Sequence, residues 1–175
     1  LALAPDSPLK AALTADVNTK DLKYLYPALI PPMLDGRIVS LALTAAGTLG
    51  DIGKAGLDIS SPGHVAFTAD GAARNVLDPD RMEASARFEG DFRDMAFREA
   101  LLPDSALRRR IAIPDRIRLR GTAGADKGAF SAASTLSTDG GEIALQGQLD
   151  TRSEAYEIEL RCDSFPLNRF LPADS

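Results

Sequence analysis

The sequence predicts a mainly β protein: a curled antiparallel sheet that forms an open apolar groove, with two or three short helices. First, apolar and polar residues alternate with a period of two along most of the chain, as in half-buried strands. Second, short polar turns such as Asp139–Gly141 separate the alternating runs, as in antiparallel meanders. Third, the 175 residues include 28 Ala, 6% aromatic residues and no Trp, which is little material for a closed core.

The alternating runs predict seven strands. Successive side chains of a strand point to opposite faces, so each run places its apolar residues together and leaves the other face polar. The clearest example is 82–89, where Met82, Ala84, Ala86 and Phe88 alternate with polar or charged residues. The predicted strands are, in order, 9–17, 37–49, 64–70, 82–89, 116–123, 142–149 and 154–162.

Two segments break the alternation and predict short helices. In 21–30, Leu22, Leu25, Tyr26 and Leu29 recur at helical spacing. Thr19 or Asp21 would be the N-cap of this helix, and Pro27 would shorten or kink it. The second segment is 94–109, which Pro103 divides.

These segments belong to a weak internal repeat. The stretches LYPALIPP (25–32), FREALLPD (97–104) and LNRFLPAD (167–174) are short apolar turns that end in Leu-Pro or Ile-Pro, about seventy residues apart. Residues 1–175 are therefore interpreted as a single fragment of a longer repetitive protein. Its units would span about 21–93 and 94–163, with a third beginning near 164. A start at Leu1 rather than Met fits a processed product or an excised fragment.

Composition argues against several function classes. A net charge of −5 disfavours a general nucleic-acid binder, and a single Cys precludes an intrachain disulfide. One His leaves no His-rich metal site, so we expect no metal and no cofactor. No apolar run reaches the roughly 18 residues that would cross a bilayer.

No catalytic constellation emerges from the chemically versatile residues, and we expect no enzyme. His64 follows Pro62-Gly63 and is interpreted as a turn residue rather than a catalytic one. Cys162 lies on an apolar strand face and is interpreted as a small buried hydrophobe. The run GTLGDIGKAG (47–56) lacks the Gly-Lys-Ser/Thr of a phosphate loop and is interpreted as a flexible connection between strands, as are the glycines near 121–128. The paired carboxylates, such as Asp78 and Asp80, fit turns and solvated faces.

Three arginines stand out because they share one strand face. Guanidinium groups suit phosphate, so these residues are possible contacts for lipid headgroups or an acidic partner. The favoured interpretation is an outward strand face that pairs with Asp and Glu on neighbouring strands. The three residues are Arg116, Arg118 and Arg120.

What remains is an extended apolar strand face with nothing obvious to cover it. Either a second sheet packs across this face or the sheet curls around an apolar ligand. Small residues would relieve crowding on the concave side of a curved sheet. The predicted groove lining comprises Val39, Leu41, Leu43, Val65, Phe67, Ala84, Ala86, Phe88, Ile117, Leu119, Ile143, Leu145, Leu149, Tyr156, Ile158 and Leu160.

Several stretches read together resemble a known family. The segment 21–52 has its pattern of a short Leu-Pro helix, then Gly, then a strand, while 72–92 and 108–125 resemble the strand block that follows. The segment 140–175 resembles its repeat unit running into the next helix. On these stretches, which cover nearly the whole chain, the sequence resembles the TamB (translocation and assembly module) and AsmA-like family in its Bacteroidetes-type form.

The resemblance implies a long twisted sheet folded into an open groove, the β-taco. It implies a periplasmic location in the cell envelope, with inner-membrane anchoring through a helix that this fragment lacks. It also implies phospholipid acyl chains as the ligand and a possible outer-membrane barrel partner, and it offers no catalytic residues.

Three functional hypotheses follow. The first is a non-catalytic segment of a periplasm-spanning lipid conduit that carries phospholipid between the inner and outer membranes. The second is a scaffold that assists assembly of outer-membrane β-barrel proteins by strand-edge or partner docking. The third, an enzyme on a β-sandwich, would need a polar cleft with convergent carboxylates.

Overall fold

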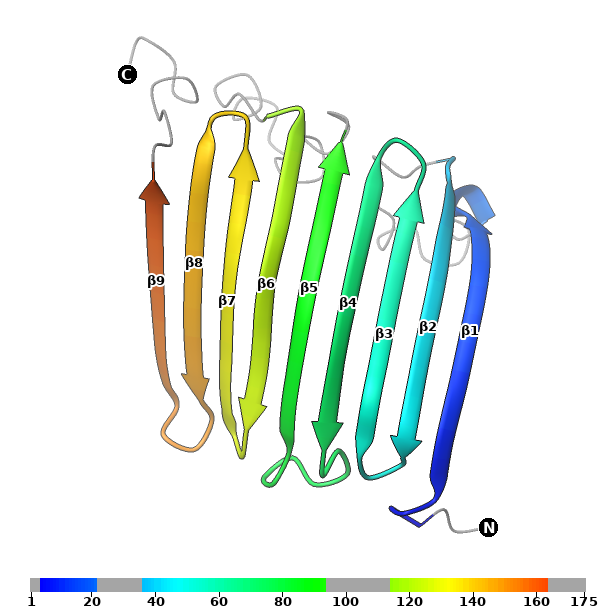
Figure 1. Ribbon diagram of the computed structural model, residues 1–175. Helices are drawn as coiled ribbons and strands as arrows, with labels where there is room; N and C mark the ends of the chain where they lie inside the picture. Colours follow the sequence, from blue (N-terminus) through cyan, green and yellow to red (C-terminus); the bar gives the residue numbers. More distant parts are fainter. Residues whose placement is uncertain (1–3, 22–35, 94–113, 164–175) are drawn as a thin grey trace.

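The computed structural model describes residues 4–21, 36–93 and 114–163, and this part of the chain is one antiparallel sheet. Nine strands lie side by side in sequence order, and the sheet is open rather than closed into a barrel (Figure 1). The prediction of a mainly β antiparallel protein is confirmed. The strands are β1 (Pro8–Asn18), β2 (Ile38–Thr48), β3 (Ile52–Ser61), β4 (Val65–Arg74), β5 (Glu83–Arg93), β6 (Arg116–Asp126), β7 (Ala129–Thr138), β8 (Gly141–Asp150) and β9 (Ala155–Asp163).

Short turns with standard chemistry join most neighbouring strands. Lys127 and Gly128, with φ of 49° and 91°, make the two-residue turn between β6 and β7, and positive φ at both positions is the signature of a type I′ hairpin. Between β8 and β9, the Asp150 carboxylate accepts hydrogen bonds from the backbone N–H groups of Arg152 and Ser153 at 2.8 and 3.3 Å. These bonds close the turn and lower the pKa of Asp150.

Two strands were not predicted from the alternation. β3 contains Gly53 and Gly56, so the interpretation of 47–56 as a flexible connection is wrong for its second half. Gly121 and Gly124 likewise lie inside β6. Glycine is disfavoured in isolated strands, but Gly56, Gly121 and Gly124 are paired with a strand on each side, while Gly53 lies at the register shifts of β3. The second unpredicted strand is β7, whose Ser and Thr residues blur the alternation.

A bulge at the end of the β2–β3 hairpin requires glycine. The register shifts between Ala46 and Gly47, where Gly47 has a φ of 143°. A Cβ at this position would lie 2.3 Å from the carbonyl oxygen of Asp51. The bulge leaves Ile52 paired with Gly47 and Ala73, so Ile52 stays on the same face as Ala55.

The described residues contain only the first turn of a helix, at 19–21. Its cap is Asn18, whose side-chain oxygen accepts the backbone N–H of Lys20 at 3.0 Å, so the predicted cap at Thr19 or Asp21 is wrong. Thr19 instead exchanges hydrogen bonds between its hydroxyl and the backbone of Arg37. The remainder of the predicted helix 21–30, the predicted helix 94–109 and the third near 164 lie outside the described residues.

The described part of the chain has almost no protein core. Its only buried apolar residue is Ile117, at 8% exposure, and its buried polar residues are Thr19 and Ser61. Each strand packs mainly against the strands beside it, and no described element lies over either face of the sheet. Each predicted repeat unit contributes four strands, β2–β5 to the first and β6–β9 to the second.

Candidate apolar binding face

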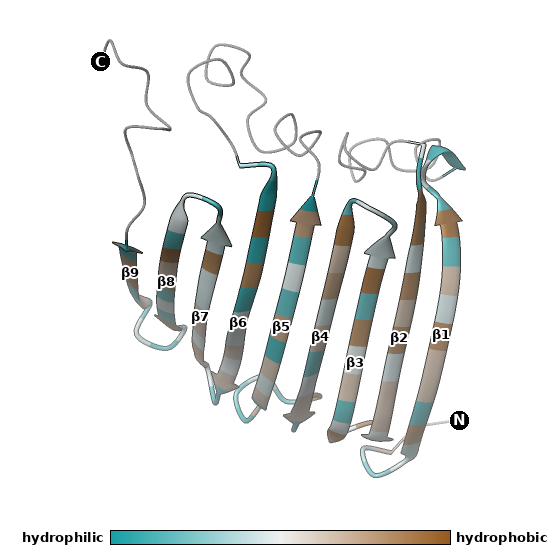
Figure 2. Ribbon diagram, turned by 45° about the horizontal axis from the view of Figure 1, so that its top comes forward, coloured by the Kyte–Doolittle hydropathy of each residue, from teal (hydrophilic) through white to brown (hydrophobic). Residues whose placement is uncertain are grey.

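The pairing register settles which residues share a face. Residues paired across neighbouring strands point to the same side, and the pairing runs unbroken from Leu13 and Leu43 on β1 and β2 to Leu145 and Leu160 on β8 and β9. All sixteen residues of the predicted groove lining lie on one side. We call this side the apolar face and the opposite side the polar face. The brown bands across the strands in Figure 2 mark the apolar residues.

The apolar face carries no charge within the described strands. From β1 to β9 no Asp, Glu, Lys, Arg or His of the strands lies on it; Ser134 carries its hydroxyl group away from the strand ends, and those of Ser61, Thr138 and Tyr156 lie near the strand ends. A face without charged or paired polar groups offers a ligand apolar contact but few directional bonds. It therefore suits hydrocarbon better than a polar small molecule.

Large apolar side chains on this face are in contact with solvent. Leu43 is 44% exposed and Leu145 43% exposed, while Ile158 on the edge strand β9 is 69% exposed. Monomeric soluble proteins rarely leave contiguous apolar patches larger than a few hundred Å² uncovered. Nine strands about 4.8 Å apart and about 33 Å long make a face of about 1,400 Å². The size of this face makes it the candidate binding surface of the described part of the chain.

Aromatic rings fill the centre of the apolar face over two glycines. The rings of Phe67 and Phe88 stack with centroids 6.4 Å apart. The Phe92 ring lies over Gly90, where an added Cβ would come within 2.6 Å of it, and the Phe88 ring covers Gly121 in the same way. Glycines at these positions let the rings lie flat on the sheet, and the rings restore the apolar cover that the glycines lack.

Two cross-strand rows of the apolar face, separated by the row that contains Leu57 and Phe88, differ sharply in side-chain size on every strand from β2 to β8 except β5. We define the large row as the paired positions Leu41, Ile59, Phe67, Gly90, Leu119, Leu136 and Ile143. Four residues along each of these strands lies the small row, the paired positions Ala45, Ala55, Gly71, Ala86, Ala123, Ala132 and Gly147. A shallow trough about one side chain deep therefore crosses the sheet at right angles to its strands, along the small row.

Arg116, Arg118 and Arg120 lie on the polar face, opposite the apolar lining. Their strand neighbours Ile117 and Leu119 are the lining residues, so the two sets alternate along β6. Arg118 pairs in register with Asp91 and Arg120 with Glu89, but no ion pair within 4 Å joins either arginine to another described residue. A ligand on the apolar face does not meet these arginines except around an edge of the sheet.

Asp91 organises the charges at one end of the polar face. Its carboxylate accepts the Nε–H of Arg116 at 2.8 Å and a second hydrogen bond from the same guanidinium, and Arg93 donates at 2.8 Å. These bonds, with that of Arg116 the stronger, hold the pKa of Asp91 well below its usual range. The pKa of Arg116 is raised by the same contact. The pairing expected between outward arginines and acids is present at Arg116.

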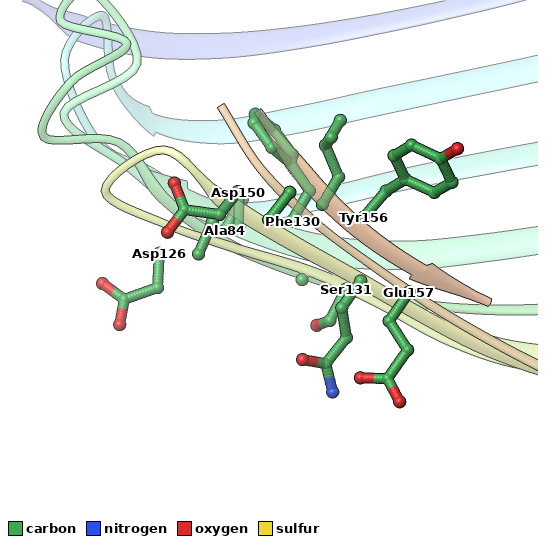
Figure 3. Close-up of a pocket in the computed structure, with 13 residues that line it drawn as sticks. Ala84, Asp126, Phe130, Ser131, Asp150, Tyr156 and Glu157 are labelled. Atoms are coloured by element: carbon green, nitrogen blue, oxygen red, sulfur yellow. The ribbon is translucent and has the colours of Figure 1, made fainter. Parts of the chain in front are cut away.

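A hollow of about 670 Å³ lies near the turn ends of β5–β9. Figure 3 shows that its lining comes from both sides of the sheet: Phe130 and Tyr156 project one way, Ser131 and Glu157 the other. Asp126, Asp150 and Glu157 line it without making an ion pair or hydrogen bond to one another. This is a rim of a single-layer sheet, and it lacks the convergent carboxylates of a polar catalytic cleft.

The other candidate residues take unremarkable positions. His64 lies in the turn between β3 and β4, where its backbone N–H bonds Ser61 at 3.0 Å. Cys162 is on the apolar face but exposed, so its predicted burial is wrong: β9 is an edge strand with no described neighbour beyond it. Asp78 begins the turn at 78–81, in which its carbonyl oxygen accepts the backbone N–H of Arg81 at 3.0 Å, and Asp80 lies within this turn, as predicted. No described helix is long and apolar enough to span a membrane. The described residues also hold no group of three metal-ligating side chains.

Several residues of the apolar face were not predicted, because the strands that carry them, β3 and β7, were not predicted. Leu57 and Ile59 on β3 and Phe130 and Leu136 on β7 pair with predicted lining residues. The feature that could have identified them is the recurrence of apolar residues at every second position, within segments that Gly or Ser otherwise dominate. Counting strands at the regular ten-residue spacing of the neighbouring runs would have found them.

Comparison with models of known protein families, with characterised proteins and with solved structures finds no match to this chain.

Proposed function

We propose that the apolar face binds the acyl chains of phospholipid, within a non-catalytic segment of a periplasm-spanning conduit between the inner and outer membranes. The observation that carries this proposal is the charge-free face that crosses nine consecutive strands. Burying one CH₂ group contributes roughly 0.8 kcal/mol, so an acyl chain along the face gains affinity at every strand it crosses. The resemblance to the TamB and AsmA-like family supports the envelope location and the lipid cargo.

The chemistry of the face suits movement as well as binding. A conduit needs affinity that does not depend on one position, because a single strong site would hold the lipid in place. The small row presents nearly the same Ala and Gly surface on seven strands, and few polar groups interrupt it. An acyl chain in this trough would exchange one set of methyl contacts for an equivalent set as it advanced.

The placement of the arginines refines the hypothesis about headgroups. Arg116, Arg118 and Arg120 lie on the polar face, so a lipid on the apolar face keeps its phosphate at the open rim and in water. In this proposal Arg118 and Arg120 are available to an acidic partner on the outside of the conduit.

The test is to purify the chain gently, extract lipid and identify it, and then label the delipidated chain with a phospholipid that carries a photoreactive group on its acyl tail. We expect co-purified phospholipid and cross-links concentrated on apolar-face residues of several strands. A chain that retains no lipid and cross-links equally on both faces would contradict the proposal.

A second candidate is a scaffold for outer-membrane β-barrel assembly. The observation that favours it is the pair of unpaired edges at β1 and β9: all nine residues of β9 are exposed, and no described strand lies beyond either edge. Free strand edges are templates for an added strand. Strand peptides from a barrel protein should then cross-link to β9 even when the apolar face is blocked by Leu145→Asp.

A further inference from the structure

We propose that, in the absence of lipid, two copies of this chain pack apolar face against apolar face as a symmetric dimer. This inference does not depend on lipid binding; it follows from the shape of the apolar face. Two open sheets that stack face to face make a β-sandwich, the usual way in which antiparallel sheets cover such faces. The dimer would supply the second layer that the described residues lack.

The area of the face is in the range of stable dimers. With about 1,400 Å² on each sheet, complete stacking would bury about 2,800 Å² in total. Standard interfaces bury about 1,200–2,000 Å² and obligate homodimers upwards of 2,000 Å². Charge depletion at the centre and an aromatic cluster of Phe67, Phe88 and Phe92 also match the composition of interface cores.

The two rows make the face self-complementary. Consider a two-fold axis midway between the two sheets, parallel to both and perpendicular to their strands. Rotation about this axis places each strand of the second copy over the same strand of the first, with the facing strands running in opposite directions. With this axis above the row of Leu57 and Phe88, the large row of one copy lies over the small row of the other. The facing pairs on the same strand are then Leu41 with Ala45, Ile59 with Ala55, Phe67 with Gly71, Leu119 with Ala123, Leu136 with Ala132 and Ile143 with Gly147.

Six of the seven facing pairs join a large side chain to Ala or Gly, and the seventh, on β5, sets Gly90, over which the Phe92 ring lies, opposite Ala86. Interdigitation of large and small residues across a layer is how protein cores reach native packing density. An interface related by a two-fold axis needs a surface that complements itself. Twisted sheets stack at about −30°, so contact is closest on the central strands and opens towards β1 and β9. This leaves Tyr156, Ile158 and Leu160 at the periphery.

The first test measures the mass of the delipidated chain by sedimentation equilibrium and follows dissociation on dilution. We expect twice the chain mass of 18.6 kDa. In this dimer Ala132 faces Leu136 of the second copy, so Ala132→Leu fills the space that this leucine occupies. The substitution should raise the dimer dissociation constant about tenfold or more, because overpacking costs about 1–3 kcal/mol. The matched control is Ala133→Leu, one residue away on the polar face of β7, which should leave the constant within about twofold.

Exchanging the side-chain sizes at positions 132 and 136 supplies a sharper test. In the double variant Ala132→Leu/Leu136→Ala, the new leucine faces the new alanine of the second copy, so dimer affinity should recover most of its loss. Non-specific apolar association predicts the opposite for Ala132→Leu, which adds apolar surface and would strengthen it. Circular dichroism of each variant verifies that the sheet is retained.

Spin labels test the geometry independently. In a Cys162→Ser background, nitroxides at Thr14 on β1 and at Thr122 on β6 should each give a distance of about 20–35 Å, from a sheet separation of about 10 Å plus two label arms. Pairing through the β9 edges would instead place the two β1 strands about 80 Å apart. A delipidated chain that stays monomeric, a tighter dimer for Ala132→Leu, or a long Thr14 distance would overturn the proposal. A monomer that binds lipid would leave the proposed function standing.

Discussion

Phe88 on β5 lies directly opposite Gly121 on β6, and its phenyl ring occupies the space that a side chain at position 121 would need. A Cβ built on Gly121 would be 2.5 Å from Cζ of Phe88 and 2.5 Å from the carbonyl oxygen of Ala133. Ring and glycine are therefore one packing unit at the centre of the apolar face. In a sheet with so little core, such cross-strand pairs carry a large share of the stability.

This pair predicts a strong dependence on side-chain size at position 121. Gly121→Ala should lower the free energy of unfolding by about 1–3 kcal/mol, because the ring and the β7 backbone must move. The matched control is Gly147→Ala, also on the apolar face but with the nearest atom 3.9 Å from the added Cβ, which should be neutral or slightly stabilising. Urea denaturation of both variants measures the difference; equal effects would remove the packing argument.

Leu145 and Gln146 are adjacent on β8 but point to opposite faces, which allows a test of lipid binding. Leu145→Asp should reduce acyl-chain photo-cross-linking about tenfold or more, since a carboxylate in contact with hydrocarbon loses hydration. Gln146→Asp introduces the same charge on the polar face and should leave cross-linking within about twofold. The 43% exposure of Leu145 means that neither change should unfold the sheet. Equal loss in both variants would point to an effect of charge alone.

Asp91 predicts a specific response to acid. The pKa of its carboxyl is lower in the folded chain than in the unfolded chain, because Arg116 and Arg93 donate to it. The contact therefore stabilises the fold above the ordinary carboxyl pKa of about 4, and this contribution is lost as the pH falls towards the lowered value. Asp91→Asn should lower the melting temperature by about 2–4 °C at pH 7 and shrink the difference between pH 7 and pH 3.

Asp58→Asn is the control for that experiment. Asp58 lies on the polar face of β3 and makes no ion pair within 4 Å to another described residue. Its replacement should leave the melting temperature nearly unchanged at both pH values. If it altered acid stability as much as Asp91→Asn, general charge repulsion would explain the pH response instead.

The sheet topology predicts a gradient of amide protection. Each strand contacts mainly its two neighbours, so opening should begin at β1 and β9, which have one described neighbour each. Hydrogen exchange followed by mass spectrometry should show about tenfold or faster exchange in β9 than in β5 and β6. Uniform protection from β1 to β9 would mean that another chain covers the edges, and would favour the strand-docking function.

The strand runs and the division into two faces could be predicted from local pattern. Wherever apolar and polar residues alternate cleanly, as in 82–89, the strand was found and its lining residues share the observed face. The pattern failed at β3 and β7, because Gly53 and Gly56 or a series of Ser and Thr carry no clear alternation. The burial of Cys162 was predicted wrongly because alternation identifies a face but not whether its strand lies at an edge.

The sequence by itself determined the class of fold, the apolar and polar sides of each predicted strand, and the small, aromatic-poor character of the lining. These follow from the two-residue period of a strand and from composition, which are local properties. Only the tertiary structure decided which residues of different strands lie side by side. Register brought Phe88 over Gly121, gathered Arg116 and Arg93 around Asp91, and aligned the residues of the large row and of the small row across the strands. A one-residue slip in pairing would undo each of these relations, and strand order and register are set by contacts distant in sequence.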